Sequence, residues 1–227
     1  MKVVSFKICP FVQRVIAHLK AGAIDHEVLY ISLRDKPDWF LEISPNAQVP
    51  VLITDAGVAL FESDAIVEYV EEAWGPLQPE LAPEERALSR AWSTLATKHY
   101  LTQCGAQRSA SAAVLEERAA RLGVAFDRIE TRLGDTPFFA GAAVGRVDLA
   151  WLTLLHRAAI IEARSGYDFL GARPKLKRWQ AALMETGLAE RSVAPDFETA
   201  FAAFYLSDET YLGRGGAAAA AAAGACC

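Results

Sequence analysis

The chain has 227 residues, of which 52% are hydrophobic and 22% are charged, a composition typical of a folded globular protein with a substantial core. Its 23 basic and 28 acidic residues give a net charge of −5 without any basic run, which argues against a nucleic-acid partner. No signal-peptide pattern opens the chain, and the longest apolar stretch, residues 149–161, is too short to span a bilayer. We therefore expect a cytoplasmic protein with no membrane partner.

The first 74 residues alternate between strand and helix patterns. Short apolar runs predict strands at residues 3–6, 27–31, 51–54 and 58–61, with a hairpin turn at residues 55–57. Helical spacing of apolar residues predicts helices over residues 10–22 and 63–74, with a short helical or irregular segment at 36–43. This order is typical of a small mixed sheet covered by helices.

A proline-rich segment separates this region from a second half with a different pattern. Three prolines between residues 75 and 83 predict a linker, and the strand signals end there. Residues 149–161 are apolar on nearly all sides, which predicts a buried central helix within an all-helical region. We expect a sheet-containing domain at 1–74, a linker at 75–84, a helical domain at 85–210 and a low-complexity tail at 211–227, which includes a run of seven consecutive alanines and ends in Cys226 and Cys227.

Cys9 stands where the first predicted strand gives way to a helix. Pro10 suits the first helical position, which leaves Cys9 at the cap, beside unpaired N–H groups. Because these groups stabilise a thiolate, we expect the pKa of Cys9 to lie below its ordinary value of about 8.5. Val12 occupies the position where a dithiol site would have its second cysteine, so disulfide chemistry at Cys9 would need an external thiol. The alternative for this local pattern is an inert, buried thiol.

Four short motifs follow one another along the first half: Cys9-Pro10-Phe11, Lys36-Pro37-Asp38-Trp39-Phe40, Gln48-Val49-Pro50-Val51-Leu52 and Phe61-Glu62-Ser63-Asp64-Ala65-Ile66. In this order the set resembles the cytosolic glutathione transferases, in the cysteine-type branch that includes the omega and dehydroascorbate-reductase classes. The resemblance covers residues 1 to about 205. It implies an α/β thioredoxin-like N-terminal domain followed by an all-α C-terminal helical domain.

The resemblance also implies which residues bind glutathione: Phe11, Lys36, Val49, Pro50, Glu62 and Ser63. In the family a cis peptide precedes the proline, and the Val49 backbone would pair with the cysteinyl backbone of glutathione. Glu62 and Ser63, at a helix start, would hold the γ-glutamyl ammonium and carboxylate. Lys36 would pair with the glycyl carboxylate, in an exposed and individually weak contact. Phe11 would lie next to the acceptor substrate.

Each of these features has an ordinary structural alternative when it is taken alone. Lys36 could be a solvated surface charge and Pro50 a strand-edge proline. Glu62 and Ser63 could belong to a helix N-cap, with Ser63 or Asp64 as the capping residue. The occurrence of all four motifs at one family's spacing favours glutathione binding over these alternatives.

From this resemblance we expect a homodimer that uses Cys9 for glutathione-dependent thiol transfer or reduction, through a glutathionyl mixed disulfide. Glutathione would be the co-substrate and a small electrophile or disulfide the acceptor. Two alternatives stay open: a transferase that conjugates glutathione to electrophiles, and a non-enzymatic binding protein with the same fold. We expect no metal, because the four histidines have no ligand spacing.

Two further positions have alternatives that the sequence leaves open. Cys104 could line the acceptor pocket, but a small helical core residue is the more common role of a free cysteine. Gly145 stands where the family has the Ser or Thr of a helix capping box, three residues before Asp148. We expect Asp148 to be structural, and the Gly145 replacement to affect stability more than chemistry.

Overall fold

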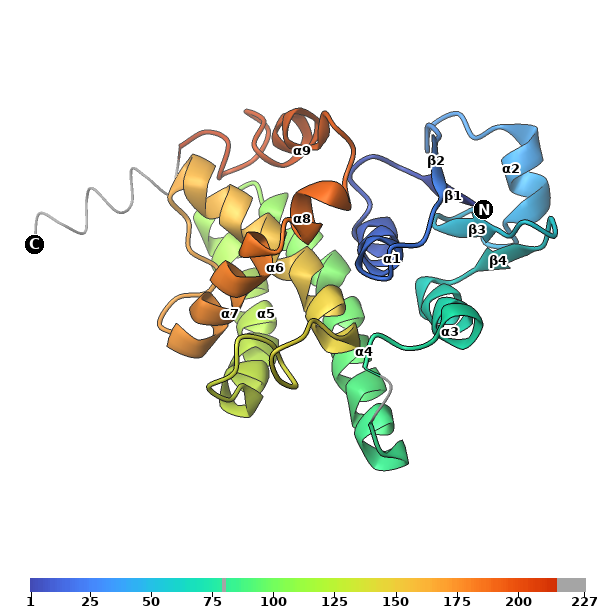
Figure 1. Ribbon diagram of the computed structural model, residues 1–227. Helices are drawn as coiled ribbons and strands as arrows, with labels where there is room; N and C mark the ends of the chain where they lie inside the picture. Colours follow the sequence, from blue (N-terminus) through green and yellow to red (C-terminus); the bar gives the residue numbers. More distant parts are fainter. Residues whose placement is uncertain (79–80, 216–227) are drawn as a thin grey trace, which may run out of the picture.

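The computed structural model describes residues 1–78 and 81–215 of the chain, as a small sheet region beside a larger helical region (Figure 1). The alanine run and the two C-terminal cysteines lie outside the described residues. In chain order the elements are β1 (Lys2–Ser5), α1 (Pro10–Ala21), β2 (Glu27–Tyr30), α2 (Asp38–Ile43), β3 (Val51–Ile53), β4 (Ala59–Phe61), α3 (Ser63–Trp74), α4 (Pro83–Gln107), α5 (Ala112–Arg132), α6 (Arg146–Ser165), α7 (Pro174–Glu185), α8 (Leu188–Arg191) and α9 (Phe197–Tyr205). The predicted combination of a small mixed sheet and a helical second half is confirmed.

The four strands form one sheet in the order β2-β1-β3-β4, in which only the β1–β2 pair is parallel. Side chains alternate between its two faces, as strand geometry requires. Val3 and Leu52 pack in one cluster with residues of α1 and α3, whereas Val4 and Val51 pack with Phe40 of α2. Both faces of the sheet are therefore covered by helices.

The turn between β3 and β4 closes the hairpin that the sequence predicts. The Thr54 amide donates to the Val58 carbonyl at 2.9 Å, and Gly57 has a φ of +79°. Glycine adopts this left-handed conformation without a steric penalty, which explains its place in the turn. The hairpin brings β4, and the start of α3 that follows it, beside the end of β3.

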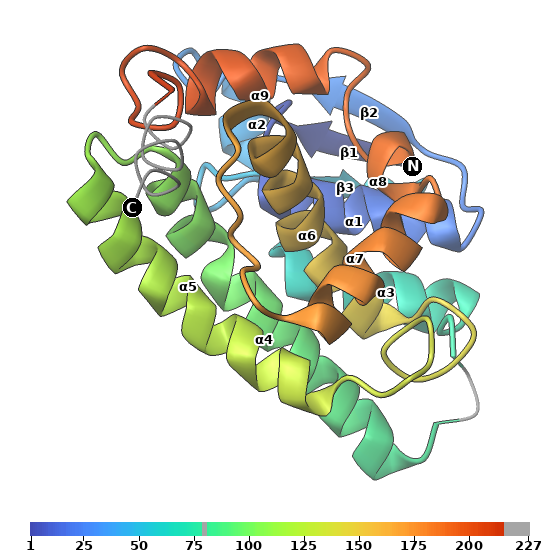
Figure 2. The ribbon, with the colours of Figure 1, turned by 90° about the vertical axis from the view of Figure 1, so that its left-hand side faces the viewer.

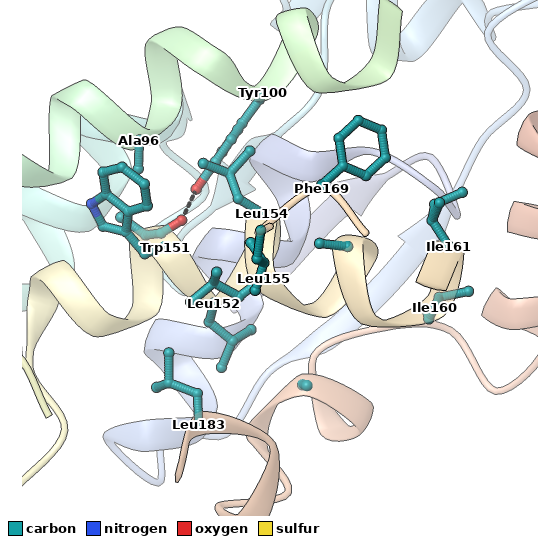
Figure 3. Packing of buried hydrophobic residues seen from close by; sticks show 14 of the residues in the cluster. Ala96, Tyr100, Trp151, Leu152, Leu154, Leu155, Ile160, Ile161, Phe169 and Leu183 are labelled. Atoms are coloured by element: carbon teal, nitrogen blue, oxygen red, sulfur yellow. Dashed lines mark hydrogen bonds between the residues drawn. The ribbon is translucent and has the colours of Figure 1, made fainter. Parts of the chain in front are cut away.

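Helix α6 is the centre of the helical region, as predicted from its apolar sequence. Nearly all of its residues are buried, and it packs against α4 and α7 and, on the sheet side, against α1. Figure 2 shows α6 between its neighbouring helices. The Tyr100 hydroxyl of α4 donates to the Ala150 carbonyl at 2.6 Å, and Figure 3 marks this bond of Tyr100 with a dashed line. No helix of the described residues is long and apolar enough to cross a membrane.

The start of α6 explains the glycine at its cap. A Cβ built on Gly145 would lie 2.3 Å from the Gln78 side chain, so this linker residue takes the space that a serine or threonine side chain would need. Asp148 keeps the other half of the capping box, accepting from the Gly145 amide at 2.8 Å. It also accepts from the Phe139 amide and the Trp179 indole. Asp148 therefore joins three segments, as expected of a structural residue.

Candidate functional site

The junction of β1 and α1 places Cys9 at a helix start. Cys9 is the N-cap residue, Pro10 is the first helical residue, and the Cys9 amide donates to the Phe6 carbonyl at 2.9 Å. The Cys9 Sγ lies 3.9 Å from the Val49 carbonyl oxygen, across from the end of the helix. The predicted cap geometry is therefore present, and it sets Cys9 beside one of the glutathione motifs.

The expectation of a lowered thiol pKa is wrong for this structure. Burial raises the pKa of Cys9 above its ordinary value, because the anion loses more hydration than its surroundings return. The backbone N–H groups of Val12 and Phe11 act in the opposite direction, as does the positive charge of Arg157. The helix start therefore favours the thiolate as predicted, but burial outweighs it.

A pocket opens between α1, the β3 entry and the start of α3. Cys9 lines a separate, smaller cavity, and it meets this pocket through the Val49 carbonyl. The lining of the larger pocket combines backbone, amide, hydroxyl and carboxylate groups with two aromatic rings: Phe11, Ser44, Asn46, Gln48, Val49, Pro50, Phe61, Glu62 and Ser63. Five of the six residues predicted to bind glutathione thus lie around one cavity. The Val49–Pro50 peptide bond is cis, as the resemblance implied.

The Glu62–Ser63 pair forms one end of this pocket. Glu62 is the N-cap of α3 with a φ of +66°, a conformation that side chains rarely adopt and that is concentrated at functional sites. Its carboxylate accepts from the Asn46 side-chain amide at 3.1 Å. Ser63 is the first helical residue, is 5% exposed and makes no side-chain cap, so the alternative of a simple Ser63 or Asp64 cap is wrong.

Arg14 contacts two residues at this end of the pocket. Its buried guanidinium pairs with the Asp64 carboxylate at 2.6 Å and donates to the Ser63 hydroxyl at 3.4 Å. The role of Arg14 was not predicted, because a charged residue one turn into a helix is usually solvated. Asn46 was also missed, since its partner Glu62 lies 16 residues away.

Lys36 is the predicted residue that the structure does not bring to the pocket. It lies half-buried in the loop between β2 and α2 and is absent from the pocket lining. The loop follows the edge strand β2, whereas the pocket lies across β3 and α3. Its contact with glutathione therefore stays a prediction.

The helical half supplies a different wall near Cys9. Phe11 meets the Tyr100 ring edge-to-face at 5.2 Å, and the pKa of Tyr100 is raised to about 12 by burial. Tyr205 of α9 is buried as well, and burial, the charge of Cys104 and a side-chain hydrogen bond with Cys104 raise the pKa of its phenol. Cys104 is partly buried against the core, so it belongs to the packing and also to this wall.

Within the described residues, no three His, Cys, Asp or Glu side chains are grouped so that they could hold a metal ion.

Comparison with known proteins places these features in a family. Residues 3–78 match the N-terminal domain of glutathione S-transferase, and residues 91–186 match its C-terminal domain. The omega-1 glutathione S-transferase of Sus scrofa is 30% identical over 216 residues, covering 92% of this chain and 87% of the relative.

Solved structures of glutathione transferases share the fold. Omega 3C of Trametes versicolor has a TM-score of 0.73 and 23% identity, covering 85% of this chain and 88% of its own. A Tau-class enzyme from mango, Mangifera indica, has a TM-score of 0.75 and 27% identity, covering 88% of this chain and 96% of its own. The thioredoxin-like N-terminal domain and the helical C-terminal domain predicted from the sequence are therefore confirmed.

Proposed function

The chain belongs to the glutathione S-transferase family and has relatives in the omega class, and from this premise we propose that it is a glutathione-dependent thiol transferase or reductase whose nucleophile is Cys9. One observation carries the proposal: the Cys9 Sγ lies 3.9 Å from the carbonyl of Val49, a residue that lines the polar pocket. A thiol at this place can exchange with the sulfur of a bound thiol peptide.

The pocket lining suits glutathione as the co-substrate. The Val49 backbone would pair with the cysteinyl backbone of glutathione, as an added strand does. The first N–H groups of α3 and the Ser63 hydroxyl would bind the γ-glutamyl carboxylate, since a helix start favours anions. Glu62 would accept from the ammonium group, and Lys36 would reach the glycyl carboxylate from its loop. Pro50 and Phe11 would bound the cysteinyl part.

In the proposed reaction, the Cys9 thiolate attacks the glutathionyl sulfur of a mixed disulfide. The Cys9–glutathionyl bond forms, the substrate S–S bond breaks, and the substrate leaves as a thiolate that takes a proton from water. A second glutathione, as its thiolate, attacks the glutathionyl sulfur held on Cys9. Oxidised glutathione leaves and the Cys9 thiolate is restored. Val12 provides no second thiol, which explains why an external one is needed.

Glutathionylation of Cys9 tests this proposal directly. The full chain is incubated with oxidised glutathione, and peptide mapping by mass spectrometry separates Cys9 from Cys104, Cys226 and Cys227. We expect one glutathionyl group on the Cys9 peptide of wild type and of Cys104→Ala. The proposal is wrong if Cys9 stays unmodified while the other cysteines react, because the nucleophile would then lie elsewhere.

Conjugation of glutathione to electrophiles is the alternative activity. In that case Cys9 would only orient the glutathione thiolate, and a serine could replace it. Conjugation of an aryl halide that is unchanged in Cys9→Ser would favour this alternative. A pure binding protein would neither turn over substrate nor be retained on immobilised glutathione.

The acceptor and the assembly are parts of the same proposal. A small disulfide or electrophile would enter between Phe11 and the helical wall. We further propose that the chain forms a homodimer, as the family resemblance implies, and light scattering after size-exclusion chromatography tests this.

A further inference from the structure

Arg157 of α6 is a buried cation without a matching anion. Its side chain is 0% exposed, and it donates through Nη2 to the Ile8 carbonyl at 3.2 Å. Its Nε and Nη1 atoms have no hydrogen-bond partner among the described residues. A buried charge without an ion-pair partner lowers the stability of the fold, so stability alone does not explain why an arginine is found at this position.

The other buried arginines show what a structural role looks like in this chain. Three arginines of the described residues are buried, and Arg14 pairs with Asp64 at 2.6 Å. Arg146 pairs with Glu71 at 2.6 Å and also with Glu68. Arg157, in contrast, forms no ion pair within the described part of the chain. Ion pairs therefore explain the burial of Arg14 and Arg146 but not that of Arg157.

The surroundings of Arg157 hold aromatic rings and neutral titratable groups. Its guanidinium lies 5.4 Å from the Phe197 ring centroid and 5.6 Å from that of Phe201, both on α9. The titratable groups that its charge reaches are Cys9 on the sheet side, Tyr100 on α4, His156 on α6 and Tyr205 on α9. Among these, Cys9 is the group that the proposed reaction converts into an anion.

Contact with Ile8 ties this charge to the reacting residue. Ile8 directly precedes Cys9, so the Arg157 hydrogen bond holds the segment that carries the thiol. Helices α1 and α6 pack against each other, which keeps Arg157 in place from the helical half. The backbone N–H groups of Phe11 and Val12 also favour the thiolate form of Cys9, whereas Cys104 opposes it.

We propose that Arg157 is a positioning residue for Cys9, which holds the Ile8 carbonyl and turns its unbalanced charge toward the thiolate formed during catalysis. This inference rests on the proposed function, in which Cys9 is the nucleophile. The buried cation then has an anion for part of each catalytic cycle. Its cost in the resting protein is consistent with retention for reactivity rather than for stability.

Alkylation of Cys9 at different pH values tests the inference without glutathione or turnover. The rate of iodoacetamide labelling of the Cys9 peptide is measured by mass spectrometry from pH 6 to 10 in wild type, Arg157→Met and Arg157→Lys. The midpoint of the profile gives the pKa of the thiol, which depends on the charges around it. The plateau at high pH shows how easily the reagent reaches the thiol. We expect Arg157→Met to move the midpoint upward and to lower the rate at pH 7 about tenfold, which corresponds to one pKa unit. Arg157→Lys keeps the charge and should recover part of that rate.

Arg146→Met is the matched control, because it removes a buried arginine at the domain boundary away from Cys9. Its midpoint should equal that of wild type. The inference is overturned if the Arg157→Met midpoint is unchanged, if Arg146→Met shifts it equally, or if Arg157→Lys recovers none of the rate. Thermal unfolding should show Arg157→Met folded, since methionine relieves a buried charge.

The same data separate this inference from the proposed function. If wild type shows no thiol transfer but Arg157→Met still shifts the midpoint, the positioning role stands and the function is wrong. If wild type is active and the midpoint does not move, the function stands and the inference is wrong.

Discussion

The two walls that meet at Cys9 are built from different chemistry. The sheet-side wall is polar: Glu62, Ser63 and Asn46 present side chains, and Val49 presents backbone. The helix-side wall consists of aromatic rings from α4 and α9 around the charge of Arg157. A wall of directional groups suits one fixed ligand, whereas an apolar wall accepts partners of varied shape. We infer that the first wall selects glutathione and the second adjusts the reactivity of Cys9.

Cys9→Ser should give the largest effect, because it removes the atom on which both walls act. We expect thiol transfer from a small mixed disulfide to fall at least about 1000-fold, since a serine hydroxyl cannot form the mixed disulfide. Glutathione affinity, measured by calorimetry, should stay within about threefold of wild type, because the polar wall is intact. Thiol transfer that persists in Cys9→Ser would show that Cys9 is not the nucleophile.

His156→Phe should affect the helix-side wall alone. The His156 ring stacks on Phe197, its Nδ1 is hydrogen-bonded to the Gln13 amide at 2.8 Å, and burial lowers its pKa to about 4 from 6.5. The unfolded protein therefore binds a proton at His156 near pH 6.5, whereas the folded protein does so only near pH 4. The contribution of His156 to the free energy of unfolding is present above pH 6.5 and is lost as the pH falls toward 4. The loss amounts to about 3 kcal/mol at most.

Urea unfolding between pH 7 and 4.5 measures this effect. His156→Phe keeps the stacking but removes the titration, so its free energy of unfolding should fall less with acid than that of wild type. Burial raises the pKa of Asp148 to about 6, which acts in the opposite direction, but this contribution is the same in both proteins and cancels. Parallel curves would show that His156 does not titrate as inferred.

Ser63→Ala should affect the polar wall alone. The hydroxyl is buried and is the group proposed to meet the γ-glutamyl carboxylate. Loss of a hydrogen bond to a charged group should weaken glutathione binding about tenfold to hundredfold. The pH profile of Cys9 alkylation should not change, in contrast to Arg157→Met. A shifted alkylation profile would show that the two walls are not separate in their effects.

The fold was predictable because its signals are local. Helix α3 begins and ends at the predicted residues 63 and 74, since its apolar positions and the flanking residues lie within one segment. The β3–β4 hairpin followed from its turn residues, and α6 from an apolar sequence on all sides. Each of these features depends on neighbours within a few residues along the chain.

The site was predictable only in part, because its electrostatics come from distant segments. The lowered pKa expected for Cys9 was wrong, since the burial that raises it comes from tertiary packing rather than from the helix start. Arg157 lies 149 residues from its partner Ile8, a contact that spacing cannot reveal. Arg14 and Asn46 were missed for the same reason. Local motifs predicted Cys9 as the nucleophile and located most of the residues that line the pocket, but they did not reveal the charged groups around them.

Gly145→Ser should give the smallest effect, because Gly145 belongs to neither wall and lies at the start of α6, against the linker residue Gln78. Serine would add a capping oxygen to α6, worth a few tenths of a kcal/mol over glycine. Its Cβ would displace Gln78, whose amide donates to the Ala143 carbonyl at 3.2 Å. The two effects should nearly cancel, leaving stability within about 0.5 kcal/mol of wild type.

In a Gln78→Ala background the space is free, so there the same change should stabilise the protein. Urea unfolding of the four proteins measures this coupling, and equal effects in both backgrounds would show that Gln78 does not explain the glycine.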